Sequence, residues 1–118
     1  MESNAILNLI VLRSRDLDRA EAFYSALGLT FARHAHGQGP VHLASESEGQ
    51  VFEIYPLAGE AVPTSSTRIG FSVSSVDATY DRLLASGGTA VTSPQDSPWG
   101  RRAVVADPDG HKVELTAE

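Results

Sequence analysis

The chain has 118 residues, of which 42% are hydrophobic and 20% are charged, and its formal net charge is −6. This composition is that of one globular domain, and the absence of cysteine excludes disulfides, thiolate metal sites and a cysteine nucleophile. The negative charge would repel a phosphate backbone, and the sequence has neither a membrane-spanning apolar run nor a secretory pattern. We therefore expect a cytoplasmic protein without nucleic-acid or membrane partners.

The first half of the chain predicts a strand, a helix and three more strands. Residues 6–12 are apolar and rich in branched side chains, as in a buried strand. Asp16 is suited to cap a helix that runs to Leu27, and Gly28 is suited to end it in a left-handed conformation. The further strands are predicted over 29–33, 41–44 and 51–55, with a glycine-rich loop over 34–40 and a hairpin loop over 45–49.

The second half repeats this plan after a small, polar, proline-containing linker over 57–66. Ser75 takes the capping position that Asp16 has in the first half, and a helix is predicted to run from there to Ser86. A long loop over 93–100 carries two prolines and the only tryptophan. Strands are predicted over 68–73, 89–92, 103–106 and 112–116.

The repeat is also visible in the residues themselves. Leu17-Asp18 followed by Gly28 returns 59 residues later as Val76-Asp77 followed by Gly87, and this offset is half the length of the chain. Because the order of the elements repeats with the residues, we interpret the chain as a pair of modules, over about 5–56 and 67–118, within one domain over 1–118. The predicted fold class is α+β, with two strand–helix–strand–strand–strand units.

Three stretches resemble the vicinal oxygen chelate superfamily, which contains glyoxalase I, extradiol dioxygenases, and fosfomycin- and bleomycin-resistance proteins. They are residues 15–20 leading into Phe23-Tyr24, then Leu27-Gly28-Leu29, and the run from Asp107-Pro108-Asp109-Gly110 to Glu114. The resemblance covers essentially the whole chain. It implies two βαβββ modules that curl into cupped mixed sheets, and it implies a homodimer, because in members of this length the halves often pair between chains to complete a cleft.

The resemblance also implies where a metal would lie. Metal-dependent members hold one divalent ion on side chains of the first and last strand of each module, which here project onto Leu9, Glu53, Arg68 and Glu114. Leucine has no lone pair, and a guanidinium is always protonated and cannot donate to a cation. We therefore expect no cofactor. The alternative left open is a non-standard divalent metal site on Glu53, Glu114 and His42.

The remaining candidates are assigned to a ligand-binding cleft. Strand alternation places Glu53 on the same face as Tyr55, opposite its apolar neighbours. Arg68 is expected either to pair with one or both glutamates, Glu53 and Glu114, or to bind an anionic group of a ligand. Trp99 is placed near the cleft mouth, where it would offer an aromatic ligand a platform.

The histidines receive different interpretations. His42 lies on a predicted strand, as a packing residue or as the one strand histidine able to serve a metal or act as a base. His34 and His36 are interpreted as loop residues without partners at ligand spacing, and His111 as part of a turn. Phe71, with Tyr55 and Trp99, would suit a flat organic ligand if all three line the cleft.

The sequence thus favours a metal-free, dimeric protein of the glyoxalase/bleomycin-resistance type that sequesters or carries a small organic ligand, of which aromatic and antibiotic-like molecules are examples. One alternative is an enzyme (a lyase, isomerase or dioxygenase) that uses the non-standard metal set. A second alternative is a structural or regulatory module that leaves its cleft unused. A fold hosts many chemistries, so the residues of the site must decide between these functions.

Overall fold

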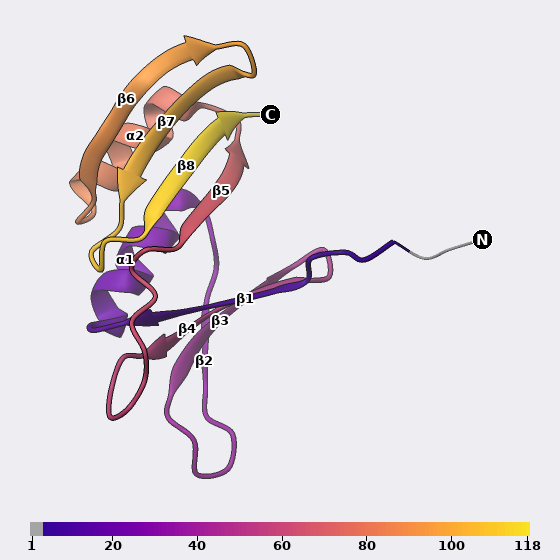
Figure 1. The fold of residues 1–118 in the computed structure, drawn as a ribbon, viewed down its shortest axis with the longest axis vertical. Coiled ribbons are helices and arrows are strands. Elements are labelled where there is room, and N and C mark those ends of the chain that lie inside the picture. Colours follow the sequence, from indigo (N-terminus) through magenta and orange to yellow (C-terminus); the bar gives the residue numbers. More distant parts are fainter. Residues whose placement is uncertain (1–3) are drawn as a thin grey trace.

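The computed structural model of this chain describes residues 4–118, which form two four-stranded mixed sheets and two α-helices (Figure 1). The elements of the first half are β1 (Leu9–Ser14), α1 (Leu17–Leu27), β2 (Ala32–His34), β3 (His42–Ser47) and β4 (Gln50–Pro56). Those of the second half are β5 (Arg68–Val73), α2 (Val76–Ala85), β6 (Thr89–Ser97), β7 (Gly100–Ala106) and β8 (Lys112–Ala117). The predicted fold of two βαβββ modules is confirmed.

The two sheets have the same strand order, β1-β4-β3-β2 and β5-β8-β7-β6. In each, the first strand runs parallel to the last, and the other neighbours are antiparallel. The first strand therefore lies at one edge of its sheet, next to the last strand of its module. Because this arrangement is common to both halves, it is the structural counterpart of the sequence repeat.

Local sequence signals set the helix ends. The side chain of Asp16 accepts a hydrogen bond from the backbone N–H of Arg19, and that of Ser75 accepts one from Ala78. These caps satisfy N–H groups that the first helical turn leaves without partners. Gly28 ends α1 with a φ of 120°, a left-handed conformation that costs glycine little. The sequence predicted all three roles.

Both helices pack on the inner faces of the sheets and share one core. Phe23 and Tyr24 of α1 are fully buried, and the Tyr24 ring meets Phe52 of β4 edge to face at 5.0 Å between centroids. Each side chain buried in this way contributes about 1.5–3 kcal/mol. The buried core consists of Leu12, Ala20, Phe23, Tyr24, Leu27, Leu43, Phe52, Ile54, Val76, Tyr80, Leu83, Ala103, Val105, Val113 and Leu115.

Three predictions in the first half were wrong at their boundaries. The hairpin loop predicted over 45–49 is only a turn at Glu48-Gly49, because β3 continues past the predicted 41–44 to Ser47, which pairs with Gln50. The strand predicted over 6–12 is β1 at Leu9–Ser14, because β4, its only neighbour in the described sheet, begins at Gln50 and offers no partner to residues 6 and 7. The strand predicted over 29–33 is reduced to β2 at Ala32–His34. Its first residue, Leu29, instead donates its N–H to the carbonyl of Tyr24 and completes the helix cap.

The loop predicted over 93–100 was also wrong. Most of it belongs to β6, which pairs with β7 as far as Ser97 and Gly100, so only two residues form the turn. Pro94 is tolerated because β6 is an edge strand and because the pairing shifts register between Thr92 and Gln95. Proline lacks an N–H, and edge strands and bulges are the places in a sheet where it fits.

The molecule is open rather than compact. The two sheets stand apart with α1 between them, and residues 4–8, before β1, extend away from the body (Figure 1). The radius of gyration is 15.0 Å, larger than the roughly 13.5 Å typical of a compact chain of this length. Within residues 4–118, neither helix has the length and apolar character needed to cross a bilayer.

Candidate functional site

The outer face of the first sheet, which points away from the helices, carries several of the predicted site residues. Glu53 pairs in register with Val11, and Tyr55 with Arg13, so these four side chains share one face. The neighbours of Glu53 on the other face, Phe52 and Ile54, are buried. This is the orientation that the alternation predicts. Leu9 and Val11 leave 50% and 39% of their surface exposed here, so apolar area is open to solvent.

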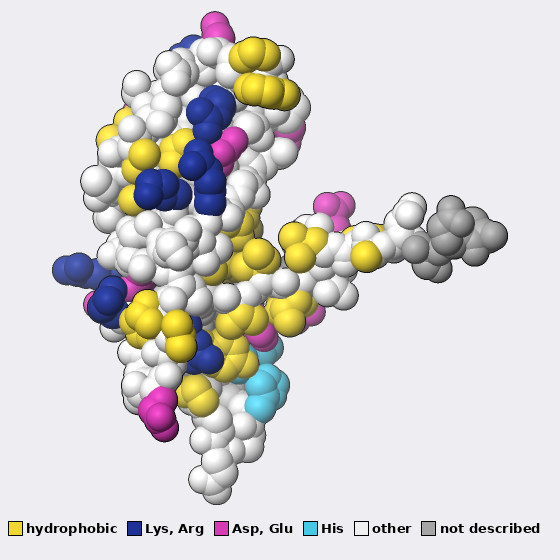
Figure 2. Space-filling model, viewed as in Figure 1, with side chains coloured by type: hydrophobic (Ala, Val, Ile, Leu, Met, Phe, Trp, Pro, Cys, Tyr) yellow, Lys and Arg dark blue, Asp and Glu magenta, His cyan; other side chains and the backbone are white. Residues whose placement is uncertain are grey.

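A cluster of charged residues lies on the outer face of the second sheet. Arg68 of β5 and Arg102 of β7 each approach Glu114 of β8, with 3.1 Å between guanidinium nitrogen and carboxylate oxygen in both pairs. The guanidinium of Arg102, and then that of Arg68, holds the pKa of Glu114 below its ordinary value although partial burial opposes this. Figure 2 shows basic side chains gathered beside an acidic one on this module. Two arginines against one glutamate leave net positive charge.

The four positions projected from the resemblance fit a divalent metal poorly. Leu9 offers no lone pair, and Arg68 lies at the position of a nitrogen ligand while donating from Nε to Glu114. Glu114 already accepts from two cations, which compete with any metal for its oxygens. Within residues 4–118 of one chain, Glu53, Glu114 and His42 form no group close enough to share an ion.

A groove of about 440 Å³ separates the two modules. Its walls are the edge strands β1 and β5 and the adjoining part of β4, and most of its lining is apolar. This volume lies within the range of about 300–1,000 Å³ that small-molecule sites occupy. The lining residues that matter here are Leu9, Val51, Phe52, Arg68 and Phe71.

The structure separates the predicted aromatic residues. Tyr55 lies on the outer face of the first sheet, with the guanidinium carbon of Arg13 5.1 Å from its ring centroid. Phe71 packs toward the core, 6.1 Å from Phe52 and 6.5 Å from Tyr24 between ring centroids, and also lines part of the groove. Trp99 lies at the tip of the β6–β7 hairpin, 83% exposed and outside the groove lining. Within one chain these rings therefore do not form a common surface.

The interpretation of the histidines also changes. His42 is 1% exposed and stacks on Tyr55 with 4.1 Å between ring centroids. His34 and His36 were interpreted as loop residues without partners, but both lie beside His42, and one ring nitrogen of each of the three is within 4.8 Å of the others. The three histidines within nine residues were the only sequence signal for this cluster, and that signal was incomplete because His36 lies beyond the end of β2 at His34.

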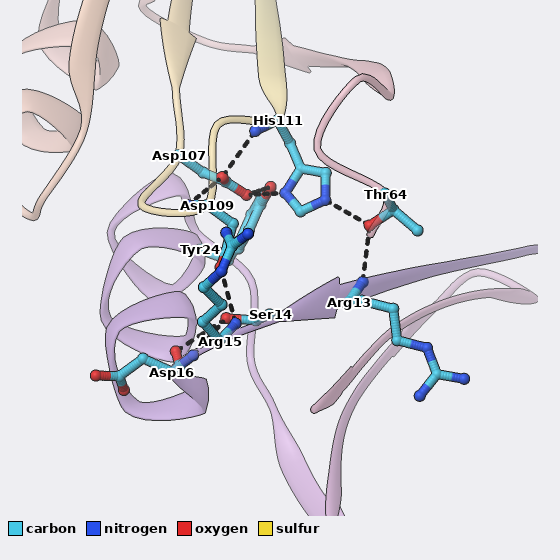
Figure 3. Close-up of polar contacts among 9 residues, drawn as sticks. All are labelled: Arg13, Ser14, Arg15, Asp16, Tyr24, Thr64, Asp107, Asp109 and His111. Carbon is cyan, nitrogen blue, oxygen red and sulfur yellow. Dashed lines mark hydrogen bonds and ion pairs between the residues drawn. The ribbon is translucent and has the colours of Figure 1, made fainter. Parts of the chain in front are cut away.

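A buried polar network joins the two modules, and sequence reasoning missed it (Figure 3). Asp107, in the turn before β8, accepts from the phenol of Tyr24 at 2.6 Å and contacts Nδ1 of His111 at 2.8 Å. Nε2 of His111 lies 2.6 Å from the hydroxyl oxygen of Thr64, and that oxygen accepts the backbone N–H of Arg13 at 2.9 Å. The chain of contacts therefore runs from α1 through the β7–β8 turn and the linker to β1.

The hydroxyl–imidazole–carboxylate order of Thr64, His111 and Asp107 is that of a hydrolase triad, but its surroundings make it structural. His111 and Asp107 are buried, and the Thr64 oxygen that would attack a substrate is already held by a backbone N–H. Asp107 also accepts the backbone N–H groups of Asp109 and His111. All these groups are satisfied within the fold, so the network acts as a tie between modules.

The network makes stability depend on pH on the acid side. Burial raises the pKa of Asp107, but the hydrogen bonds from His111 and Tyr24 outweigh it and leave that pKa below its ordinary value. A carboxylate of this kind stabilises the fold above its unfolded pKa of about 3.9 and loses that contribution as the pH falls through its folded pKa.

We expect the free energy of unfolding to fall as the pH is lowered below about 4, and the Asp107→Asn protein to lose part of this slope. Urea unfolding at a series of pH values measures both slopes. Glu114 and Asp77 also have lowered pKa values and remain in the variant, so the slope should shrink rather than vanish. Equal slopes in the two proteins would show that Asp107 titrates alike in the folded and unfolded chain.

Comparisons with known proteins agree with this fold. The family model described as "Glyoxalase/Bleomycin resistance protein/Dioxygenase superfamily" matches residues 6–115. An uncharacterized protein of Mycolicibacterium smegmatis is 32% identical over 111 residues, which are 89% of this chain and 87% of that protein.

Two solved structures illustrate the structural likeness. A glyoxalase-related enzyme from Fulvimarina pelagi superposes with a TM-score of 0.76 at 25% identity, covering 96% of this chain and 88% of that one. TnmS3, an antibiotic binding protein from Streptomyces sp. CB03234, superposes with a TM-score of 0.74 at 24% identity, covering 99% and 98%. At the identity of this second structure the likeness concerns the fold alone.

Proposed function

The chain belongs to the Glyoxalase/Bleomycin resistance protein/Dioxygenase superfamily, and from that premise we propose that it binds a small organic ligand without a metal at the family's usual position. The observation that carries the proposal is the ion-pair cluster of Arg68, Arg102 and Glu114. In this cluster Arg68, whose guanidinium is always positively charged, lies at a position where metal-dependent members of the family have a metal ligand. A guanidinium there suits a ligand's anionic group, to which it can donate two parallel hydrogen bonds.

The apolar surface nearby supports a ligand that is also partly apolar. Most of the surface that lines the groove between the modules is apolar, and the side chains of Leu9 and Val11 are partly exposed beside it. Open apolar area next to a cationic group favours an amphiphilic molecule, such as an aromatic carboxylate. TnmS3, which shares this fold, is an antibiotic binding protein, so the fold is compatible with such a role.

We also propose that a second copy of the chain completes the cleft. The edge strands β1 and β5 have free edges within the described chain, and the molecule is more open than a compact monomer. Exposed edge strands and exposed apolar residues are surfaces that proteins commonly bury by binding a second chain. In such a pair, the outer face of one chain's first module would meet that of the partner's second module.

The enzymatic alternative with a metal on Glu53, Glu114 and His42 has less support. Glu114 is engaged by two arginines, and binding an ion would require both ion pairs to be given up. A purely structural role has less support as well, because the groove is open rather than filled by the chain's own side chains.

Three naphthalene compounds of similar size test the proposal: 1-naphthoate, the neutral 1-naphthylmethanol and the cationic 1-naphthylmethylamine. We expect 1-naphthoate to bind most tightly in calorimetric titrations, because only its carboxylate is negatively charged and can accept two parallel hydrogen bonds from Arg68. The Arg68→Met variant should bind it about tenfold or more weakly, the scale of one charge-assisted hydrogen bond. Arg19→Met, which removes an exposed arginine on α1, is the matched control.

The result that contradicts the proposal is equal affinity for the three compounds, or no binding to any of them at millimolar concentration. The second copy is tested separately with Val11→Lys, which places a charge on the exposed apolar face. We expect light scattering to report a dimer for the natural chain and a monomer for this variant, with 1-naphthoate binding lost at the same time. A monomeric variant that still binds 1-naphthoate would confine the cleft to a single chain.

A further inference from the structure

Three of the four histidines of the chain gather at one end of the first sheet. The ring centroids of His34 and His36 are 5.9 Å apart, those of His34 and His42 are 6.0 Å apart, and those of His36 and His42 are 5.3 Å apart. One ring nitrogen of each lies within 4.8 Å of the other two. Figure 2 shows histidine side chains gathered in one place on the first module.

The fold brings these residues together through pairing and a turn. His34 of β2 and His42 of β3 are directly opposite each other in the antiparallel ladder, where side chains of a pair are neighbours on one face. The chain then reverses between His36 and Gly39, whose N–H donates to the carbonyl of His36. Gly37 takes a φ of 58° in this turn, which glycine adopts without strain. This turn places the His36 side chain next to those of His34 and His42.

The imidazole of His42 is held with one nitrogen left over. Its Nδ1 lies 3.3 Å from the carbonyl oxygen of Pro40, and its ring stacks on Tyr55 at an interplanar angle of 6°. Its Nε2 is buried and has no hydrogen-bond partner, although a carboxylate oxygen of Glu53 lies 3.6 Å away. A ring that donates from one nitrogen to a carbonyl and presents the other with a free lone pair is the usual form of a metal-binding histidine.

We propose that His34, His36 and His42 bind a divalent transition-metal ion of the zinc class. Three neutral imidazoles suit zinc, nickel and copper, and the fourth position would go to Glu53 or to water. Zinc–nitrogen bonds of about 2.0–2.1 Å in a tetrahedral site bring ligand atoms to about 3.4 Å from one another. The ring nitrogens, which lie within 4.8 Å of one another, must therefore approach by up to about 1.4 Å on binding, and the exposed loop that carries His36 can supply this movement.

This site is distinct from the family's usual metal position. Its three histidines lie at none of the four projected positions, of which only Glu53 could be shared as a fourth ligand, and all its residues belong to the first module. It does not rest on the proposed function, because neither the groove nor a second copy of the chain contributes a ligand. The competing explanation for the orphan nitrogen is a proton on Nε2, which would pair His42 with Glu53 without any ion.

The test is a titration of the untagged, metal-stripped chain with Zn²⁺, followed by calorimetry, with elemental analysis after gel filtration. We expect one zinc per chain. The His36→Ala variant, altered in an exposed loop that the core does not need, should bind more than 100-fold more weakly, since even loss of a residue that only supports a ligand costs about 10–100-fold. Gln38→Ala changes the same loop without removing a ligand and should bind like the natural chain.

Co²⁺ in place of Zn²⁺ gives a readout of geometry. Its visible absorption should intensify on binding to the natural chain and should be absent with His36→Ala. The proposal is overturned if the natural chain retains no zinc, or if His36→Ala binds it as tightly as Gln38→Ala does. A folded His36→Ala protein that has lost zinc but keeps 1-naphthoate binding would support this site and leave the proposed function standing on its own test.

Discussion

Replacing Asp107 with alanine should lower the free energy of unfolding by about 3–5 kcal/mol, the scale observed when one partner of a buried charged network is removed. The 4% exposed Asp107 accepts four hydrogen bonds, from the phenol of Tyr24, the imidazole and backbone N–H of His111, and the backbone N–H of Asp109. Alanine leaves these buried donors without an acceptor, and each unsatisfied group costs about 1–3 kcal/mol. The midpoint and slope of urea unfolding measure the loss.

The matched control is Asp81→Ala, which removes an exposed carboxylate from α2. Surface changes of this kind usually stay within about 0.5 kcal/mol. Asp107→Asn should fall between the two, because an amide retains one oxygen to accept hydrogen bonds and brings a new donor that faces other donors. A loss below about 1 kcal/mol for Asp107→Ala would mean that the network contributes little, and that apolar contacts alone hold the modules together.

The second large effect is expected at Gly88, where a single added methyl group has no room. A Cβ atom there would lie 2.6 Å from a methyl carbon of Val105, 2.8 Å from the carbonyl oxygen of Leu83 and 2.8 Å from the ring of Phe23. Phe23 belongs to the first module, so the glycine lies where α1 packs closely against the residues that follow α2. Overpacking of a close-packed core costs about 1–3 kcal/mol, and we expect Gly88→Ala near the upper end.

Gly70→Ala is the matched control for this prediction. Its added Cβ would meet only the carbonyl oxygen of Glu114, at 3.9 Å, which is an ordinary contact. Because alanine reduces the freedom of the unfolded chain, this change should be neutral or slightly stabilising. Thermal unfolding of the two variants side by side gives the comparison. If Gly88→Ala unfolds at the same temperature as Gly70→Ala, the module interface must be able to separate at little cost.

The parts of the fold that local sequence signals specify could be predicted. A capping side chain acts within three residues, and a helix-ending glycine acts on the turn before it, so Asp16, Ser75 and Gly28 were identified correctly. The repeat added the order of the elements. The first and last residues of a strand depend instead on the extent of the neighbouring strand with which it pairs. For this reason the bounds of β1 and β6 were predicted wrongly.

The site was harder to predict because its contacts are distant in the chain. The prediction that Arg68 pairs with a glutamate agrees with its contact to Glu114, but nothing in the sequence pointed to Arg102 as the second partner. Tyr24 and Asp107 are 83 residues apart, and no local pattern links them. The histidine cluster depends on the register of β2 against β3 and on one turn, and neither could be read from spacing alone.

The polar tie between the modules bears on how a duplicated protein diverges. The two halves share strand order, helix and caps, yet the tie is one-sided: the first half supplies the phenol of Tyr24, and the second supplies Asp107 and His111. The residue that corresponds to Tyr24 by the offset of 59 is the apolar Leu83. A chain built from two first halves would therefore bury two phenols without the acceptor. The halves of this chain have become complementary, so that each depends on the other although they still resemble each other in form.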